Sequence, residues 1–104
     1  MEGMEMTCFE IISNVGTARG CYVEAIDLAT EGKFEEAEKK VAEGATYFSK
    51  GHNAHTDLVQ KEAAGEKTDV ILLLVHAEDQ LMSAEGFKII AEKFIAMSKK
   101  LYNK

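Results

Sequence analysis

Three polar residues that could support chemistry lie close together in one short stretch, V-H-A-E-D-Q-L-M, at residues 75–82. On a helix, His76, Asp79 and Gln80 would project from neighbouring turns of the same side. A neutral imidazole is a good nucleophile at pH 7, and its attack on a transferable phosphoryl group gives a phosphohistidine. Such a site needs an acceptor for the second ring nitrogen and polar groups around the phosphoryl oxygens. The amide of Gln80 and the hydroxyl of Ser83 are candidates for that cradle.

These polar residues interrupt a helical stripe that is apolar on both sides of them. On a wheel of about 100° per residue, the stripe consists of Leu72, His76, Asp79, Gln80, Ser83, Phe87, Ile90 and Phe94. We therefore expect His76, Asp79 and Gln80 on the buried side of this helix. Glu78 falls on the other side, where we expect it to be solvated.

Burial of Asp79 would require compensation, because an unpaired carboxylate inside a protein costs several kcal/mol. It could pair with His76 three residues earlier, or with Arg19 from another helix. It could also bind a divalent cation, since carboxylate oxygens are the ligands that magnesium and calcium prefer. The spacing of the residues leaves these three possibilities open.

The residues alone also allow other roles for these polar side chains. A zinc-peptidase motif is absent because H-x-x-D-Q differs from H-E-x-x-H, and no Ser or Cys stands beside a His as in a hydrolytic loop. The polar residues could serve only to fix the register of a non-enzymatic helical interaction module. They could also form a metal-binding bundle without transfer chemistry.

Three segments with helical periodicity must position these residues. They run from about Met4 to Thr30, from Phe34 to Ala64 and from Asp69 to Asn103. An apolar run at 70–75 could be a buried strand, but it continues into a 3.6-residue pattern that favours a helix. The predicted fold class is all-α, with three long antiparallel helices in each protomer.

The breaks between the segments carry the residues that end and begin helices. Gly32 and Gly65 can adopt the left-handed conformation that terminates a helix. Thr68 or Asp69 can cap the start of the third helix.

Three such helices make a thin rod with little interior. A helix of 30 residues is about 45 Å long, and a rod of three has a poor ratio of core to surface. The first segment also carries two apolar stripes, which is more than a surface helix needs. We therefore expect a homo-oligomer in which the rods associate.

Composition narrows the function classes. The 104 residues, with a net charge of −6, predict one domain over 1–104 and exclude nucleic acid as a partner. The charge favours a partner with a basic docking face. The longest strictly apolar run, 70–75, is far short of the about 20 residues that span a membrane, and the first residues lack the positive charge of a signal peptide. We therefore expect a cytoplasmic protein with no direct membrane insertion.

The two cysteines are expected to be free and buried. Cys8 and Cys21 would lie about 20 Å apart on one helix, whereas a disulfide requires Cα atoms within about 7 Å. Unpaired thiols are typical of a reducing compartment, where they act as small packing residues.

Several stretches together resemble one protein family. L-L-L-V-H-A-E-D-Q-L-M is similar to the active-site helix of the lactose/cellobiose-type enzyme IIA of the bacterial phosphoenolpyruvate-dependent sugar phosphotransferase system, which typically reads L-L-x-V-H-A-Q-D-H-L-M. E-I-I-S-N-V-G-T-A-R-G resembles its first helix, with a G-x-A-R element at Gly16, Ala18 and Arg19. E-G-K-F-E-E-A-E resembles its first turn, and H-N-A-H-T-D-L-V-Q-K-E-A-A-G-E resembles its A-H-x-x-Q-T-x-L-I-Q-x-E-A segment.

The resemblance implies three helices per protomer and a compact homotrimer. It implies that His76 accepts a phosphoryl group from the histidine-containing phosphocarrier protein. His76 would then pass the group to a cysteine of the cognate IIB component during uptake of a sugar of the lactose, β-glucoside, cellobiose or chitobiose type. It also implies that three copies of Asp79 meet on the threefold axis around one divalent cation, expected to be Mg²⁺. A shared cation would resolve the burial of Asp79.

The sequence departs from the family pattern at three places. The usual Gln after H-A is Glu78, the usual His after Asp is Gln80, and the usual Gln of the second-helix segment is His55. His52 and His55 stand three residues apart on the second helix. They could be polar packing that faces the phosphoryl site or the trimer interior, or a separate metal-binding pair.

Overall fold

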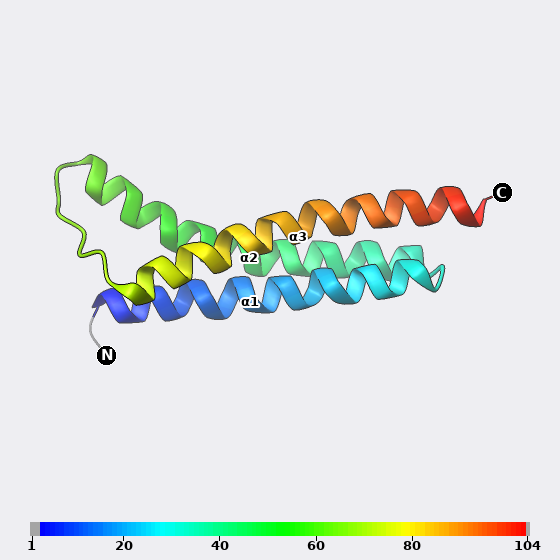
Figure 1. Cartoon of the computed structure of the whole chain (residues 1–104), viewed down its shortest axis with the longest axis horizontal. Helices are drawn as coiled ribbons and strands as arrows, with labels where there is room; N and C mark the ends of the chain where they lie inside the picture. Colours follow the sequence, from blue (N-terminus) through cyan, green and yellow to red (C-terminus); the bar gives the residue numbers. More distant parts are fainter. Residues whose placement is uncertain (1–2, 104) are drawn as a thin grey trace.

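The computed structural model describes residues 3–103 and consists of three long helices arranged as a rod of 56 × 25 × 19 Å (Figure 1). Helix α1 spans Gly3–Thr30, α2 spans Phe34–Ala63 and α3 spans Leu72–Tyr102. Consecutive helices run antiparallel, and residues 3–103 contain no strand. The all-α class with three antiparallel helices is therefore confirmed. None of the three helices is long and apolar enough to cross a membrane.

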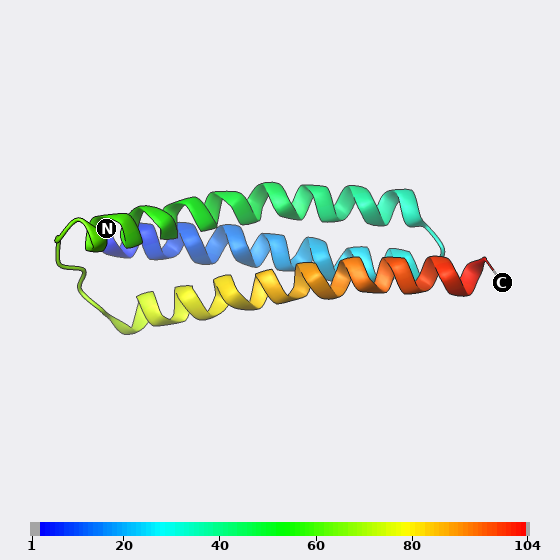
Figure 2. The same ribbon diagram turned by 90° about the horizontal axis from the view of Figure 1, so that it is seen from above.

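Both glycines predicted to end helices do so. Gly32 and Gly65 have φ values of 80° and 93°. After α1, the backbone N–H of Gly32 donates to the carbonyl of Ala29 and that of Lys33 donates to Leu28. The same pair of hydrogen bonds follows α2, and in both places the pattern is a Schellman motif. The long loop after α2 lies at the same end of the rod as the start of α1 (Figure 2).

Helix α3 begins later than predicted. The residue before its first turn is Ile71, which is extended (φ −107°, ψ 161°) and provides no side-chain cap. Its carbonyl accepts the N–H groups of Leu74 and Val75. The prediction that Thr68 or Asp69 caps this helix is wrong. The β-branched pair Val70–Ile71 favours extended backbone, and no buried contact draws it into the helix.

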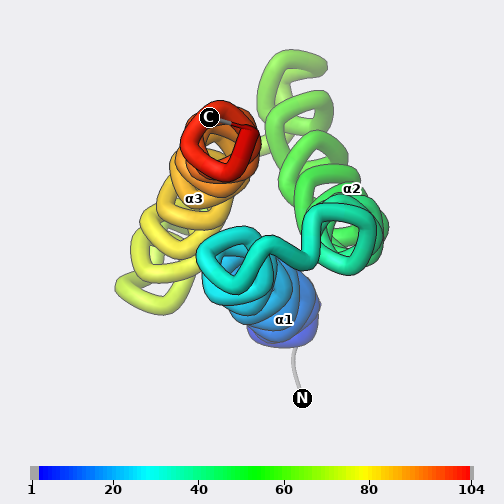
Figure 3. Tube along the Cα trace, turned by 90° about the vertical axis from the view of Figure 1, so that its right-hand side faces the viewer, coloured from blue at the N-terminus to red at the C-terminus, as the bar shows by residue number. Residues whose placement is uncertain are grey.

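Helix α1 is the centre of the protomer. It packs against both α2 and α3, whereas α2 and α3 diverge from one another towards the loop that joins them (Figure 3). The residues of α1 that are buried recur at helical spacing: Cys8, Ile11, Val15, Ala18, Cys21, Tyr22, Ala25 and Ala29. The prediction of free, buried cysteines is confirmed. Burial raises the pKa of both thiols, and it raises the pKa of the enclosed Tyr22 to about 12.

Small residues let α2 approach α1 closely. Ala37, Gly44 and Gly51 are the buried residues of α2 and stand seven positions apart. A Cβ atom added at Gly44 would lie 2.6 Å from the Tyr22 ring, and one at Gly51 would lie 2.6 Å from Cγ1 of Val15. Glycine is therefore required at both positions for the observed separation of the two helices.

This close approach can be tested with two glycine substitutions. Gly51→Ala should lower the free energy of unfolding by about 1–2 kcal/mol, because overpacking outweighs the helix propensity that alanine adds. Gly20→Ala is the matched control, since a Cβ at that exposed position meets no heavy atom within 4 Å. It should raise the free energy of unfolding by about 0.5–1 kcal/mol. Urea unfolding at one protein concentration measures both, and equal effects would contradict the packing account.

Candidate functional site

The polar residues of α3 face outward in the single chain. His76 and Asp79 are exposed and Gln80 is half-buried. The expectation that all three lie on the buried side of the helix is therefore wrong for one protomer. The side of α3 that packs within the chain carries other residues: Leu74, Ala77, Leu81, Ala84, Ala91, Ile95 and Ser98. The expected stripe is only partly covered by the same chain: Phe87 packs against the core, whereas Leu72, Ile90 and Phe94 at its two ends are exposed.

A second series of α3 residues runs along the outside of the rod, opposite the packed side. These residues alternate by three and four, and we call them the α3 seam: Leu72, Val75, Asp79, Met82, Gly86, Ile89, Lys93 and Ala96. Four apolar members of the seam are at least half exposed: Leu72 (84%), Val75 (50%), Met82 (72%) and Ile89 (53%). This spacing is the a/d heptad pattern of a coiled coil. In that frame Asp79 occupies an a position.

Arg19, which was one candidate partner for Asp79, contacts a different residue of α3. Its guanidinium Nη1 donates to the hydroxyl of Ser83 at 3.2 Å, which joins α1 to α3 one turn below Asp79. Among residues 3–103, Asp79 forms an ion pair neither with Arg19 nor with His76. Two of the three compensations considered for Asp79 are thus absent within the chain. Ser83, a predicted member of the phosphoryl cradle, is held in place by α1.

The two histidines of α2 have different surroundings. Nε2 of His55 donates to Oε1 of Glu78 at 3.0 Å and joins α2 to α3. The His52 ring instead stacks on Phe48, with 5.9 Å between ring centroids. No group of three or more His, Cys, Asp and Glu residues suited to a metal occurs in the described part of the chain. The two histidines therefore have different partners, and Nε2 of His55 is engaged by Glu78.

The contact between His55 and Glu78 was not expected from the sequence. Glu78 was expected to be solvated, and its side chain is 51% exposed, but it has a hydrogen-bonded partner. Both residues line a cavity of about 130 Å³ between the end of α2 and the start of α3. One feature of the sequence could have indicated this contact: residues 55 and 78 are both usually glutamine in the family pattern, and both differ here. The two substituted residues contact one another.

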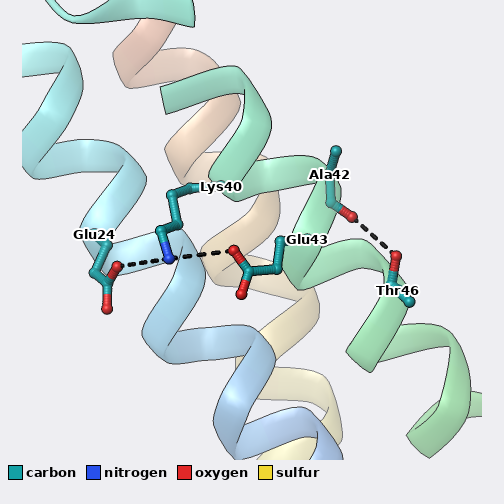
Figure 4. Close-up of polar contacts among 5 residues, drawn as sticks. All are labelled: Glu24, Lys40, Ala42, Glu43 and Thr46. Carbon is teal, nitrogen blue, oxygen red and sulfur yellow. Dashed lines mark hydrogen bonds and ion pairs between the residues drawn. The ribbon is translucent and has the colours of Figure 1, made fainter. Parts of the chain in front are cut away.

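A second polar cluster lies towards the opposite end of the rod. Nζ of Lys40 lies 3.1 Å from a carboxylate oxygen of Glu24 and 3.2 Å from one of Glu43 (Figure 4). The hydrogen bond to Glu24, and to a lesser extent that to Glu43, raises the pKa of Lys40. Acidic residues dominate the surrounding depression, and no His, Cys, Ser or Thr among residues 3–103 lines it. The cluster ties α1 to α2 and is separate from the histidine site.

Comparisons with known proteins identify relatives over nearly the whole chain. Residues 6–99 match the family model described as the lactose/cellobiose-specific IIA subunit of the PTS system. The lichenan-specific phosphotransferase enzyme IIA component of Bacillus subtilis (strain 168) is 44% identical, over 96% of this chain and 91% of that protein. The lactose-specific EIIA component of Staphylococcus epidermidis is 31% identical, over 93% of each chain.

Solved structures agree with this assignment. The PTS cellobiose-specific enzyme IIA from Bacillus anthracis superposes with a TM-score of 0.96 at 39% identity, covering 100% of this chain and 95% of that chain. PtcA from S. mutans superposes with a TM-score of 0.89 at 35% identity, covering 95% of this chain and 99% of that one. Proteins of this family are phosphotransferases, so the alternative of a non-enzymatic helical module is not supported. The chain belongs to the lactose/cellobiose-specific IIA family and is a sugar-specific component of a phosphotransferase system.

Proposed function

We propose that His76 is the phosphoryl carrier of this protein. The observation that supports it most is the state of the three histidines. His76 is exposed and makes no side-chain hydrogen bond within residues 3–103, whereas His55 binds Glu78 and His52 stacks on Phe48. A nucleophile that exchanges a phosphoryl group between two proteins needs this accessibility.

The transfer consists of two in-line displacements. The histidine-containing phosphocarrier protein presents a phosphohistidine, and a ring nitrogen of His76 forms its N–P bond as the carrier's N–P bond breaks. A cysteine thiolate of the cognate IIB component then attacks, so that an S–P bond forms and the imidazole of His76 leaves. Both partners dock transiently, and the net charge of −6 favours basic docking faces. The proposed location is the cytoplasm, and the transported sugar is of the lactose or β-glucoside type.

A direct test is phosphorylation with the histidine-containing phosphocarrier protein, its upstream kinase and phosphoenolpyruvate. Wild type should take up one acid-labile phosphate per chain, and His76→Ala should take up none. His52→Ala is the matched control and should be labelled like wild type. Acid-labile phosphate on the His76→Ala variant would contradict the assignment.

The α3 seam supports a homotrimer around Asp79. A cyclic assembly along the seam places the α3 helices parallel and side by side. It covers Leu72, Val75 and Met82, which one chain leaves exposed. It also brings three Asp79 carboxylates to the axis, where they repel one another unless a cation neutralises them.

The residues present fit a magnesium ion. Each chain offers one carboxylate at an exposed a position of the seam. In a trimer, the three Asp79 carboxylates would hold the ion through hard oxygen ligands of the kind that Mg²⁺ prefers. When bound, the ion would balance the three buried charges. The ion takes no part in the transfer at His76, so the proposed role of Asp79 is in assembly of the trimer.

The trimer predicts unequal effects for two substitutions on α3. Met82→Glu places carboxylates inside the seam next to Asp79, and the protein should dissociate to its 11.5 kDa chain. Leu101→Glu is the control, because Leu101 lies off the seam and is 59% exposed, compared with 72% for Met82. The trimer should persist in this variant. Sedimentation velocity distinguishes the two. A wild type that sediments as a monomer would contradict the trimer itself.

The metal predicts a second pair of effects. Chelation with EDTA should lower the melting temperature of wild type, because the three Asp79 carboxylates are then uncompensated. Asp79→Leu should remain trimeric and lose this sensitivity. Asp57→Leu, at an exposed position of α2, should keep the sensitivity of wild type. If chelation leaves the wild-type melting temperature unchanged, the metal is not part of the assembly.

A further inference from the structure

The site at His76 is incomplete within one chain. An imidazole that attacks through one nitrogen needs an acceptor that holds the N–H of the other. Among residues 3–103, no side chain accepts a hydrogen bond from His76. Its exposure leaves the acceptor to come from outside the protomer.

The heptad frame of the α3 seam indicates where that acceptor lies. With Asp79 at a, His76 falls at an e position and Glu78 at a g position. In parallel helices around an axis, the e side of one helix meets the g side of the next. His76 and Glu78 differ by two residues, or about 3 Å along the axis. His76 of one protomer and Glu78 of the neighbouring protomer therefore face the same boundary at nearly the same level.

The helices around α3 agree with this placement. On the e side, α1 contacts α3 through Arg19 and Ser83, and Ser83 is the e residue one heptad after His76. On the g side, α2 contacts α3 through His55 and Glu78. In the proposed trimer, each boundary would therefore be formed by the α1 side of one protomer and the α2 side of the next.

We propose that the Glu78–His55 pair of one protomer completes the His76 site of the neighbouring protomer. The proposal rests on the phosphoryl-carrier function of His76 and on the homotrimer proposed above. Oε1 of Glu78 accepts the hydrogen bond from His55, and Oε2 has no partner within residues 3–103. Oε2 accepts the ring N–H of the neighbour's His76, which leaves the other ring nitrogen free to attack. Glu78 and His55 are positioning residues, since neither touches the phosphorus.

The pairing also accounts for two of the departures from the family pattern. A carboxylate near a site that receives a dianionic phosphoryl group would repel it if it were free to turn towards the group. The hydrogen bond from His55 holds the carboxylate on the α2 side of the boundary. Glu78 therefore requires a donor at position 55, and His55 supplies one.

The first test compares Glu78→Ala, Glu78→Gln and Glu85→Ala in the full-length protein. Glu85 is exposed and occupies the g position one heptad later, so it is the matched control. Glu78→Ala should slow single-turnover phosphorylation of His76 by about ten- to hundredfold, as expected for loss of an orienting partner. Glu78→Gln keeps an acceptor oxygen and should restore most of the rate. Glu85→Ala should match wild type.

A second readout follows the imidazole itself. Nitrogen NMR should show one dominant tautomer of His76 in wild type and a mixture in Glu78→Ala. Sedimentation of each variant verifies that the trimer is intact. An unchanged rate and tautomer in trimeric Glu78→Ala would overturn the proposal.

Mixed trimers decide whether Glu78 acts across the boundary. Glu78→Ala chains keep His76, and His76→Ala chains keep Glu78, so reassembly of the two places an intact Glu78 beside some intact His76 residues. With random mixing in equal amounts, about half of the labelled His76 should show the wild-type rate. A mixture with only the slow phase would overturn the proposal. Failure of the phosphoryl-carrier function itself would give a different result. Wild type would then take up no phosphate, whereas the tautomer of His76 would still show whether Glu78 holds its ring.

Discussion

Helix α3 carries apolar residues around more of its circumference than α1 and α2 can cover. One side packs within the chain through residues such as Leu74, Leu81 and Ile95, and the α3 seam lies on the other side. Full burial of a large apolar side chain is worth roughly 1.5–3 kcal/mol. Leaving the seam in water therefore forfeits several such contributions in every protomer. This imbalance drives the proposed trimer, and the location of the phosphoryl site follows from it.

The packing of α1 against α2 determines which side of α3 remains uncovered. Gly44 and Gly51 bring α2 so close to α1 that the two helices form one narrow support. Helix α3 lies against α1 and diverges from α2 near its start. His55 and Glu78 bridge that divergence in the region that precedes Asp79. The first turns of α3 are thereby fixed without being enclosed, which suits the role proposed for His76.

Much of the fold follows from the sequence, and the exceptions have physical causes. Helical periodicity and the two terminating glycines identify three helices with ends close to those observed. Helix α3 starts later than predicted because the extended preference of Val70 and Ile71 prevails over the capping preference of Asp69. A wheel reveals that a stripe is apolar, but it does not reveal whether the same chain or another covers it. Asp79 was therefore expected to be buried in a protomer that leaves it exposed.

Contacts between helices were the least predictable part of the site. Arg19 was a sensible partner for Asp79, yet it reaches Ser83 one turn away, because the axial offset between α1 and α3 depends on the whole interface. The contact between His55 and Glu78 depends likewise on how far α2 and α3 diverge. Spacing along one helix reports none of this.

In the proposed trimer, the α3 helices of three chains meet at Asp79 and thereby assemble the His76 site. A crystal structure of the protein grown with Mg²⁺ tests this arrangement most directly. The account predicts three parallel α3 helices around one axis, with an oxygen of each Asp79 about 2.0–2.1 Å from a single ion. An assembly in which the Asp79 carboxylates face solvent, or in which the α3 seam remains uncovered, would contradict it.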